Sequence, residues 1–109
     1  MNPTAKALQD LFDRTPRRHN PENVKEIYSI LDEYEDLLMT IEAVNSFYEK
    51  AIPAFFDELE LVRSTIKKSN DNKASKKLKD NLFDEGSGKL KDSLQTLMEL
   101  YGDGSRTAW

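Results

Sequence analysis

Apolar side chains recur at alternating steps of four and three residues from Ile27 to Ile66, and this heptad repeat constrains the fold more than any other feature. Such spacing keeps one side of an α-helix apolar and is typical of helices that pack together in bundles and coiled coils. The positions of the repeat are Ile27, Leu31, Tyr34, Leu38, Ile41, Asn45, Tyr48, Ile52, Phe55, Leu59, Val62 and Ile66. Because apolar residues do not alternate as they do in a half-buried strand, the sequence predicts an all-α fold.

The residues within and before the repeat bear on how many helices carry it. Asn20-Pro21-Glu22 is a strong helix start, because Asn caps the first turn, Pro suits the first helical position and Glu complements the helix dipole. Pro53 lies inside the repeat, where a proline costs a helix roughly 3 kcal/mol and would divide it in two. The apolar phase nevertheless crosses Pro53 unchanged, so we expect one kinked helix from 21 to 69. The alternative is a restart after Asn45, where Ser46-Phe47-Tyr48-Glu49 has the pattern of a capping box.

Asn45 is the one polar member of the repeat. A buried Asn at such a position fixes the register of a coiled coil at a cost in stability. Alternatively, Asn45 is exposed because the helix bends or ends there, and we favour this second interpretation.

A second helical segment follows the turn that Ser69-Asn70-Asp71-Asn72 predicts. It runs from about 74 to 101, and Gly86-Ser87-Gly88 is expected to interrupt it, with Ser87 capping the second piece. Its apolar stripe consists of Leu78, Leu82, Leu90, Leu94, Leu97 and Tyr101. Together the two segments predict an elongated helical hairpin or a small helical bundle.

The ends of the chain complete the predicted organisation. Residues 1–20 form an N-terminal arm with a short amphipathic helix from Thr4 to Asp13, residues 21–101 form the helical domain, and residues 102–109 form a flexible tail.

The lengths of these segments predict an interface. The return segment of about 28 residues covers a similar length of the long helix, nominally 41–69, and leaves the apolar stripe before it without a partner. Either the N-terminal helix folds over this stripe or another chain does, and we expect a homodimer or a foreign partner helix. The predicted interface residues are Val24, Ile27, Leu31, Tyr34, Leu37, Leu38 and Ile41.

Composition excludes most catalytic chemistry. The chain has no cysteine and a single histidine, His19, so neither a thiolate nucleophile nor a His-rich metal site can be assembled. The many carboxylates from Glu22 to Glu42 are expected to form a solvated acidic face. We therefore predict no catalytic, cofactor-binding or metal-binding residue. The first residues, Met1 to Lys6, lack the basic and apolar regions of a secretory signal, and no apolar run reaches the roughly 20 residues that a bilayer span needs, so we expect a cytoplasmic protein without a membrane partner.

Charge is distributed unevenly along the chain, although the net charge is only −4. Residues 21–62 carry eleven acidic and two basic side chains, whereas residues 63–80 carry seven basic and two acidic ones. The second segment could neutralise several phosphates, or it could be a solvated tip that pairs with acidic side chains. It lacks the interleaved aromatic residues that stack on bases. Its candidate phosphate-binding residues are Arg63, Lys67, Lys68, Lys73, Lys76, Lys77 and Lys79.

The sequence thus predicts a non-enzymatic protein–protein interaction module, such as an adaptor, an assembly factor or a regulator, that binds through its apolar stripe. The alternative is a nucleic-acid-associated accessory protein that uses the basic segment 63–79.

Overall fold

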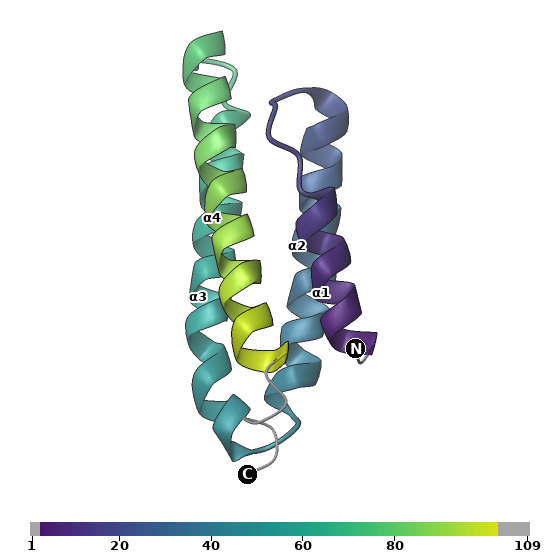
Figure 1. Cartoon of the computed structure of the whole chain (residues 1–109). Coiled ribbons are helices and arrows are strands. Elements are labelled where there is room, and N and C mark those ends of the chain that lie inside the picture. The colour runs from purple at the N-terminus through teal and green to yellow at the C-terminus, as the bar shows by residue number, and fades with distance from the viewer. Residues whose placement is uncertain (1–2, 103–109) are drawn as a thin grey trace.

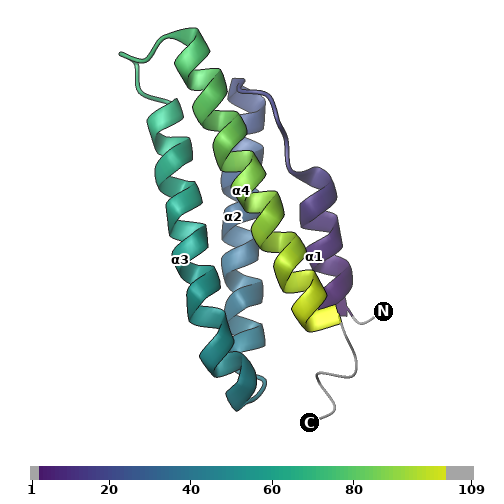
Figure 2. The same ribbon diagram turned by 60° about the vertical axis from the view of Figure 1, so that its left-hand side comes forward.

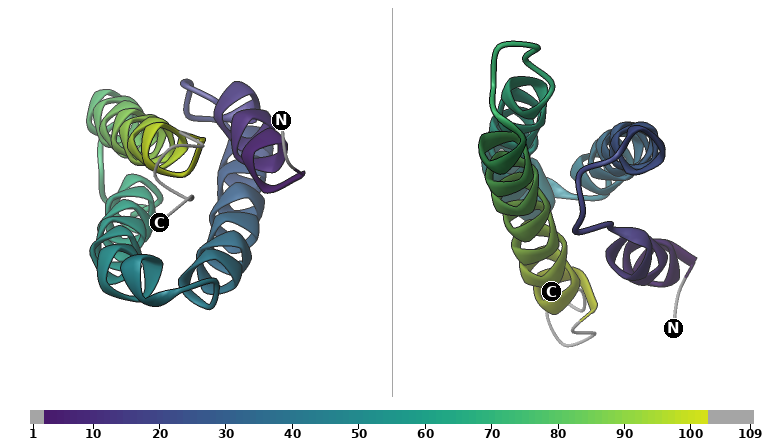
Figure 3. Two further views of the ribbon diagram at one scale, coloured as in Figure 1. Left: turned by 60° about the horizontal axis from the view of Figure 1, so that its bottom comes forward. Right: turned by 90° about the horizontal axis from the view of Figure 1, so that it is seen from above.

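The computed structural model describes residues 3–102, and in that range the chain forms a bundle of four α-helices (Figure 1). The helices are α1 (Pro3–Arg14), α2 (Pro21–Glu42), α3 (Ser46–Ser69) and α4 (Lys76–Gly102). Successive helices run in opposite directions, and each packs against its neighbours in the order α1, α2, α3, α4 and back to α1 (Figures 1 and 3). The bundle is elongated, with principal extents of 50 × 23 × 17 Å. The prediction of an all-α helical bundle is confirmed.

The chain turns back between α2 and α3, so the prediction of one kinked helix from 21 to 69 is wrong. Asn20 caps α2 as expected, and its side chain accepts a hydrogen bond from the backbone N–H of Asn23. Asn45 caps α3 in the same way, accepting from the backbone N–H of Tyr48 at 3.0 Å. The cap therefore lies one residue before the Ser46 of the capping-box pattern, and Asn45 is exposed because a helix begins there.

The heptad positions all face the core except Asn45. The spacing of apolar residues continues across the turn because α2 and α3 each direct one apolar face toward the core. Two separate helices can keep this spacing as well as one continuous helix can. Pro53 lies two turns into α3, and both Pro53 and Glu49, whose carbonyl loses its usual donor, are exposed residues. α3 passes Pro53 without ending.

α4 continues through Gly86-Ser87-Gly88, and the predicted interruption is wrong. Gly86 is buried against α3, and a Cβ added to it would lie 2.7 Å from Cδ1 of Ile66. The glycine therefore permits a close approach of two helices rather than a break in one. The predicted stripe of α4 is correct at Leu90, Leu94 and Leu97, whereas Leu78 is 47% exposed.

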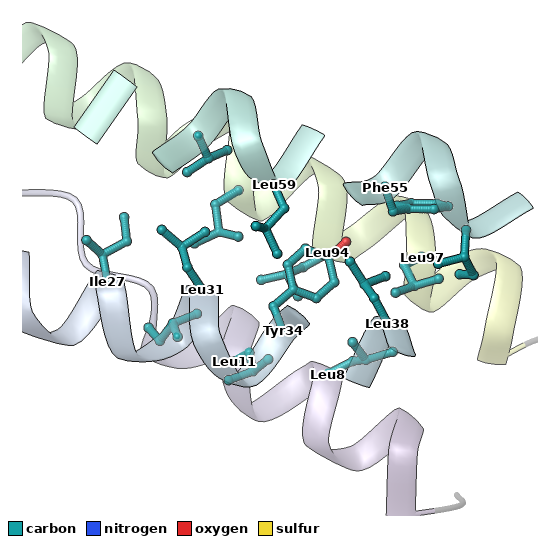
Figure 4. Close-up of a cluster of buried hydrophobic side chains, with 14 of the residues drawn as sticks. Leu8, Leu11, Ile27, Leu31, Tyr34, Leu38, Phe55, Leu59, Leu94 and Leu97 are labelled. Carbon is teal, nitrogen blue, oxygen red and sulfur yellow. The ribbon is translucent and has the colours of Figure 1, made fainter. Parts of the chain in front are cut away.

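α1 is a full member of the bundle. It packs against α2 and α4, and its Leu8 and Leu11 belong to the same hydrophobic core as the other three helices (Figure 4). Arg14, at its end, forms ion pairs of 3.0 Å with Asp10, Glu26 and Glu33. Hydrogen bonds to Glu33 and Asp10 raise the pKa of Arg14 above its ordinary value. Of the two partners expected for the apolar stripe of α2, the N-terminal helix or another chain, it is thus α1 that packs beside α2, and α1 also contacts α4. The tail predicted for 102–109 lies outside the described residues, apart from Gly102, which ends α4.

Candidate functional site

The predicted apolar interface on α2 lies in the core of the bundle. Five of its seven side chains are 0% exposed, namely Ile27, Leu31, Tyr34, Leu38 and Ile41, while Val24 and Leu37 are partly buried. A single helix from 21 to 69 would leave these side chains on a free surface. Since the chain turns back at residues 43–45, α3 packs along α2, and α1 covers part of the remaining face (Figure 2). The five fully buried residues are therefore not available to a partner in the folded chain.

The buried face of α2 also carries a polar network. The hydroxyl of Tyr34 lies 2.8 Å from Oγ of Ser93, and Ser93 donates a hydrogen bond of 2.6 Å to Oε1 of Glu58. Burial raises the pKa of the Tyr34 phenol, and the bond to Ser93 opposes this rise. The network joins α2, α3 and α4, and we assign it a structural role.

Two loops meet at one end of the bundle, where α1 leads into α2 and α3 leads into α4 (Figure 1). Nε2 of His19 lies 3.2 Å from Oδ1 of Asn70. The His19 ring packs edge-on against the buried ring of Phe83, with 5.7 Å between the two ring centroids. Arg17 forms an ion pair of 2.7 Å with Asp84 of α4. We call this region, made of residues 15–22 and 67–84, the basic end, because it carries eight Lys and Arg side chains and four Asp and Glu side chains.

The lysines of the basic end form no ion pair within residues 3–102. Lys79 is half-buried and the others are exposed, and none forms an ion pair with a described residue. Elsewhere, Arg14, Arg63 and Lys89 pair with carboxylates, whereas Lys6, Lys25 and Lys50 form no ion pair with a described residue, so the lysines of the basic end are distinguished by their proximity to one another. The lysines in question are Lys67, Lys68, Lys73, Lys76, Lys77 and Lys79. Like charges gathered in this way attract anions to the end of the bundle.

Arg63, in contrast, does not belong to this surface. Its side chain is 26% exposed, and its guanidinium forms ion pairs with Asp32 at 3.1 Å and with Glu35 at 2.7 Å, both on α2. Arg63 therefore connects α3 to α2 along the side of the bundle. Because these carboxylates pair with its guanidinium, we leave Arg63 out of the basic end, and its assignment as a phosphate-binding residue stays a prediction.

Arg17 and Arg18 were absent from the predicted site, although the structure places them at the same end as the lysines. Residues 1–20 carry four basic and two acidic side chains, and this basic excess is the sequence feature that points to Arg17 and Arg18 as part of the site. Arg17 and Arg18 are far from Lys76 in the sequence, and they lie near it only because α1 packs back onto the bundle.

Residues 3–102 contain no group of three or more His, Cys, Asp or Glu side chains placed to hold a metal ion. None of the four helices combines the length and the apolar character needed to cross a bilayer.

Comparison with protein-family models, with curated proteins and with solved structures finds no match for this chain. The geometry and the charge of the basic end remain as indications of function.

Proposed function

We propose that this protein is a non-enzymatic, nucleic-acid-associated accessory protein whose basic end binds the phosphate backbone. The observation that supports the proposal is the gathering of six lysines, none paired with a described carboxylate, at one end of a chain whose net charge is −4. A protein that neutralises phosphates with lysine releases condensed counterions, and this supplies most of the free energy of non-specific binding.

The arrangement favours backbone contact over sequence recognition. Lys67 and Lys68 stand in the last turn of α3, Lys73 in the loop, and Lys76 and Lys77 in the first turn of α4. Sequence is read by side chains that reach base edges, for which Arg, Asn and Gln are the usual types. Phe83, the one Phe, Tyr or Trp of the basic end, is buried, so the exposed lysines contact phosphates as point charges without a Phe, Tyr or Trp ring for base stacking.

The proposal is tested by fluorescence anisotropy with a labelled DNA duplex and a labelled single strand of the same sequence, at about 50 mM salt. The test variant is Lys73→Glu with Lys76→Glu, for which we expect at least a roughly 10-fold loss of affinity. The control variant is Lys6→Glu with Lys50→Glu. Lys6 and Lys50 are also exposed and without an ion pair to a described residue, but they lie near the first turns of α1 and α3, at the opposite end.

Both double variants change the net charge by the same amount, so a difference between them locates the binding surface. Equal affinities for the two variants, or no binding by the unmodified protein to either probe, would contradict the proposal. The class that the sequence favoured, a protein–protein interaction module, stays a prediction. The surface assigned to it is buried, and a protein partner would have to bind elsewhere on the bundle.

A further inference from the structure

A cleft of ≈ 560 Å³ lies within the basic end, between the loop that joins α1 to α2 and the first turns of α4. Every side chain that lines it is polar or charged. The loop contributes Arg17, Arg18, His19 and Asn20, and α4 contributes Lys76, Asp80, Asn81 and Asp84. The two sides of the cleft are more than 50 residues apart in the sequence, so the cleft exists only in the folded chain.

Arg18 differs from the other arginines that the structure describes. Arg14, Arg17 and Arg63 all form ion pairs with carboxylates, whereas the exposed side chain of Arg18 has no hydrogen-bond or ion-pair partner among residues 3–102. A guanidinium binds a phosphate through two parallel hydrogen bonds, which lysine cannot reproduce. Arg18 is therefore the one described arginine whose donors are all available to a ligand.

The backbone around Arg18 is held in place from both sides. Nδ2 of Asn23 donates a hydrogen bond of 2.9 Å to the carbonyl of Arg18. Arg17 before it reaches Asp84 through two contacts, of 3.0 and 2.7 Å, and His19 after it reaches Asn70. A site whose supporting backbone is fixed before the ligand arrives loses less conformational entropy on binding.

The charges of the lining favour an anion. Asp84 is neutralised by Arg17, and Arg18 and Lys76 outnumber Asp80, which has no ion pair with a described residue. We infer that Arg18 and Lys76 hold one phosphate group of a nucleic acid backbone in this cleft, while the surrounding lysines contact neighbouring phosphates. This inference rests on the proposed function and adds to it a defined site and a residue that the charge pattern alone did not indicate.

The inference is tested by a ¹H–¹⁵N NMR titration of the full chain with inorganic phosphate, and with chloride at matched ionic strength. We expect phosphate-specific shifts concentrated at residues 17–20 and 76–84. Arg18→Ala and Arg18→Lys should both lose them, because a lysine does not replace the bidentate contact. Asp80→Asn should strengthen phosphate binding, since it removes a repelling charge. Lys73→Ala is the control, because Lys73 lies at the same end but does not line the cleft.

The same variants in the anisotropy assay separate this inference from the proposed function. Arg18→Ala should weaken DNA binding severalfold and more than Lys73→Ala does. If the two variants weaken DNA binding equally and the phosphate shifts spread evenly over the basic end, the cleft inference is overturned while backbone binding stands. If the cleft binds phosphate but the unmodified protein binds no nucleic acid, the assignment to a nucleic acid backbone is overturned together with the proposed function.

Discussion

Nε2 of His19 lies 3.2 Å from Oδ1 of Asn70, and this contact connects two residues that are 51 positions apart in the sequence. It holds the loop between α1 and α2 against the loop between α3 and α4. The segments 15–22 and 67–84, each with a small excess of basic side chains, thereby lie at the same end of the bundle. The charge of this end is a property of the fold, since it depends on α1 returning the chain to the point where α3 ends.

Leu31→Asp should unfold the protein rather than only separate it from a partner. Leu31 is 0% exposed, and an unpaired buried charge costs about 3 to 5 kcal/mol, a large part of the 5 to 15 kcal/mol that stabilises a typical domain. Circular dichroism during thermal unfolding measures the effect. Leu61→Asp is the control, because Leu61 is 52% exposed on α3 and its replacement should cost less than about 1 kcal/mol. A well-folded Leu31→Asp protein would show that this face of α2 is not core.

Gly86→Ala and Gly88→Ala should affect stability in opposite directions. Alanine in place of glycine favours a helix by about 1 kcal/mol, and at Gly88 the nearest atom to the new Cβ is Nη2 of Arg17, at 3.9 Å. We expect Gly88→Ala to raise the melting temperature by about 4 to 8 °C. At Gly86 the new Cβ would meet Cδ1 of Ile66 at 2.7 Å, and overpacking costs about 1 to 3 kcal/mol, so the net effect should be destabilising.

The cause of the Gly86 effect can be isolated with Ile66→Val, which removes the Cδ1 atom. In that background, Gly86→Ala should become neutral or stabilising, a coupling of about 1 kcal/mol between two contacting residues. Additive effects of the two substitutions would mean that α3 and α4 do not approach as closely as described.

Tyr34 should make the protein sensitive to alkaline pH. Its folded-state pKa is raised, so the folded chain keeps the phenol protonated at a pH where the unfolded chain ionises it. This contribution to stability is complete below about pH 10, the ordinary pKa of tyrosine, and is lost as the pH rises above it, at up to about 1.4 kcal/mol per pH unit. Urea denaturation between about pH 9 and pH 11.5 should therefore show a steeper loss for the unmodified protein than for Tyr34→Phe. Parallel curves would contradict the assignment.

The apolar pattern predicted the core residues correctly, but it predicted one helix where the structure has two, α2 and α3, joined by a turn. Eleven of the twelve heptad positions are buried, and only Asn45 is not. Periodicity reports which side of a helix faces inward, but a turn of three residues between two helices leaves that phase unchanged. Asn45 held the decisive information, because its side chain caps α3, and the pattern of Ser46 to Glu49 pointed to the same place.

The candidate site was only partly predictable for a related reason. The six lysines between Lys67 and Lys79 are close together in the sequence, so local charge was enough to find them. The charge pattern groups Arg63 with these lysines, whereas in the fold it pairs with Asp32 and Glu35, which lie on α2 and become its neighbours only when the chain turns back. Arg18 was missed because its proximity to Lys76 arises from the packing of α1 and of the loop that follows it.

The most direct test of the central claim is the salt dependence of DNA binding. For a duplex, the logarithm of the binding constant falls with the logarithm of the salt concentration with a slope of about −0.9 for each phosphate that is neutralised. We predict a slope of about −3 to −5 for the unmodified protein, and a slope smaller by about 2 for Lys73→Glu with Lys76→Glu. An unchanged slope in that variant, or binding that does not respond to salt, would show that the basic end does not bind phosphates.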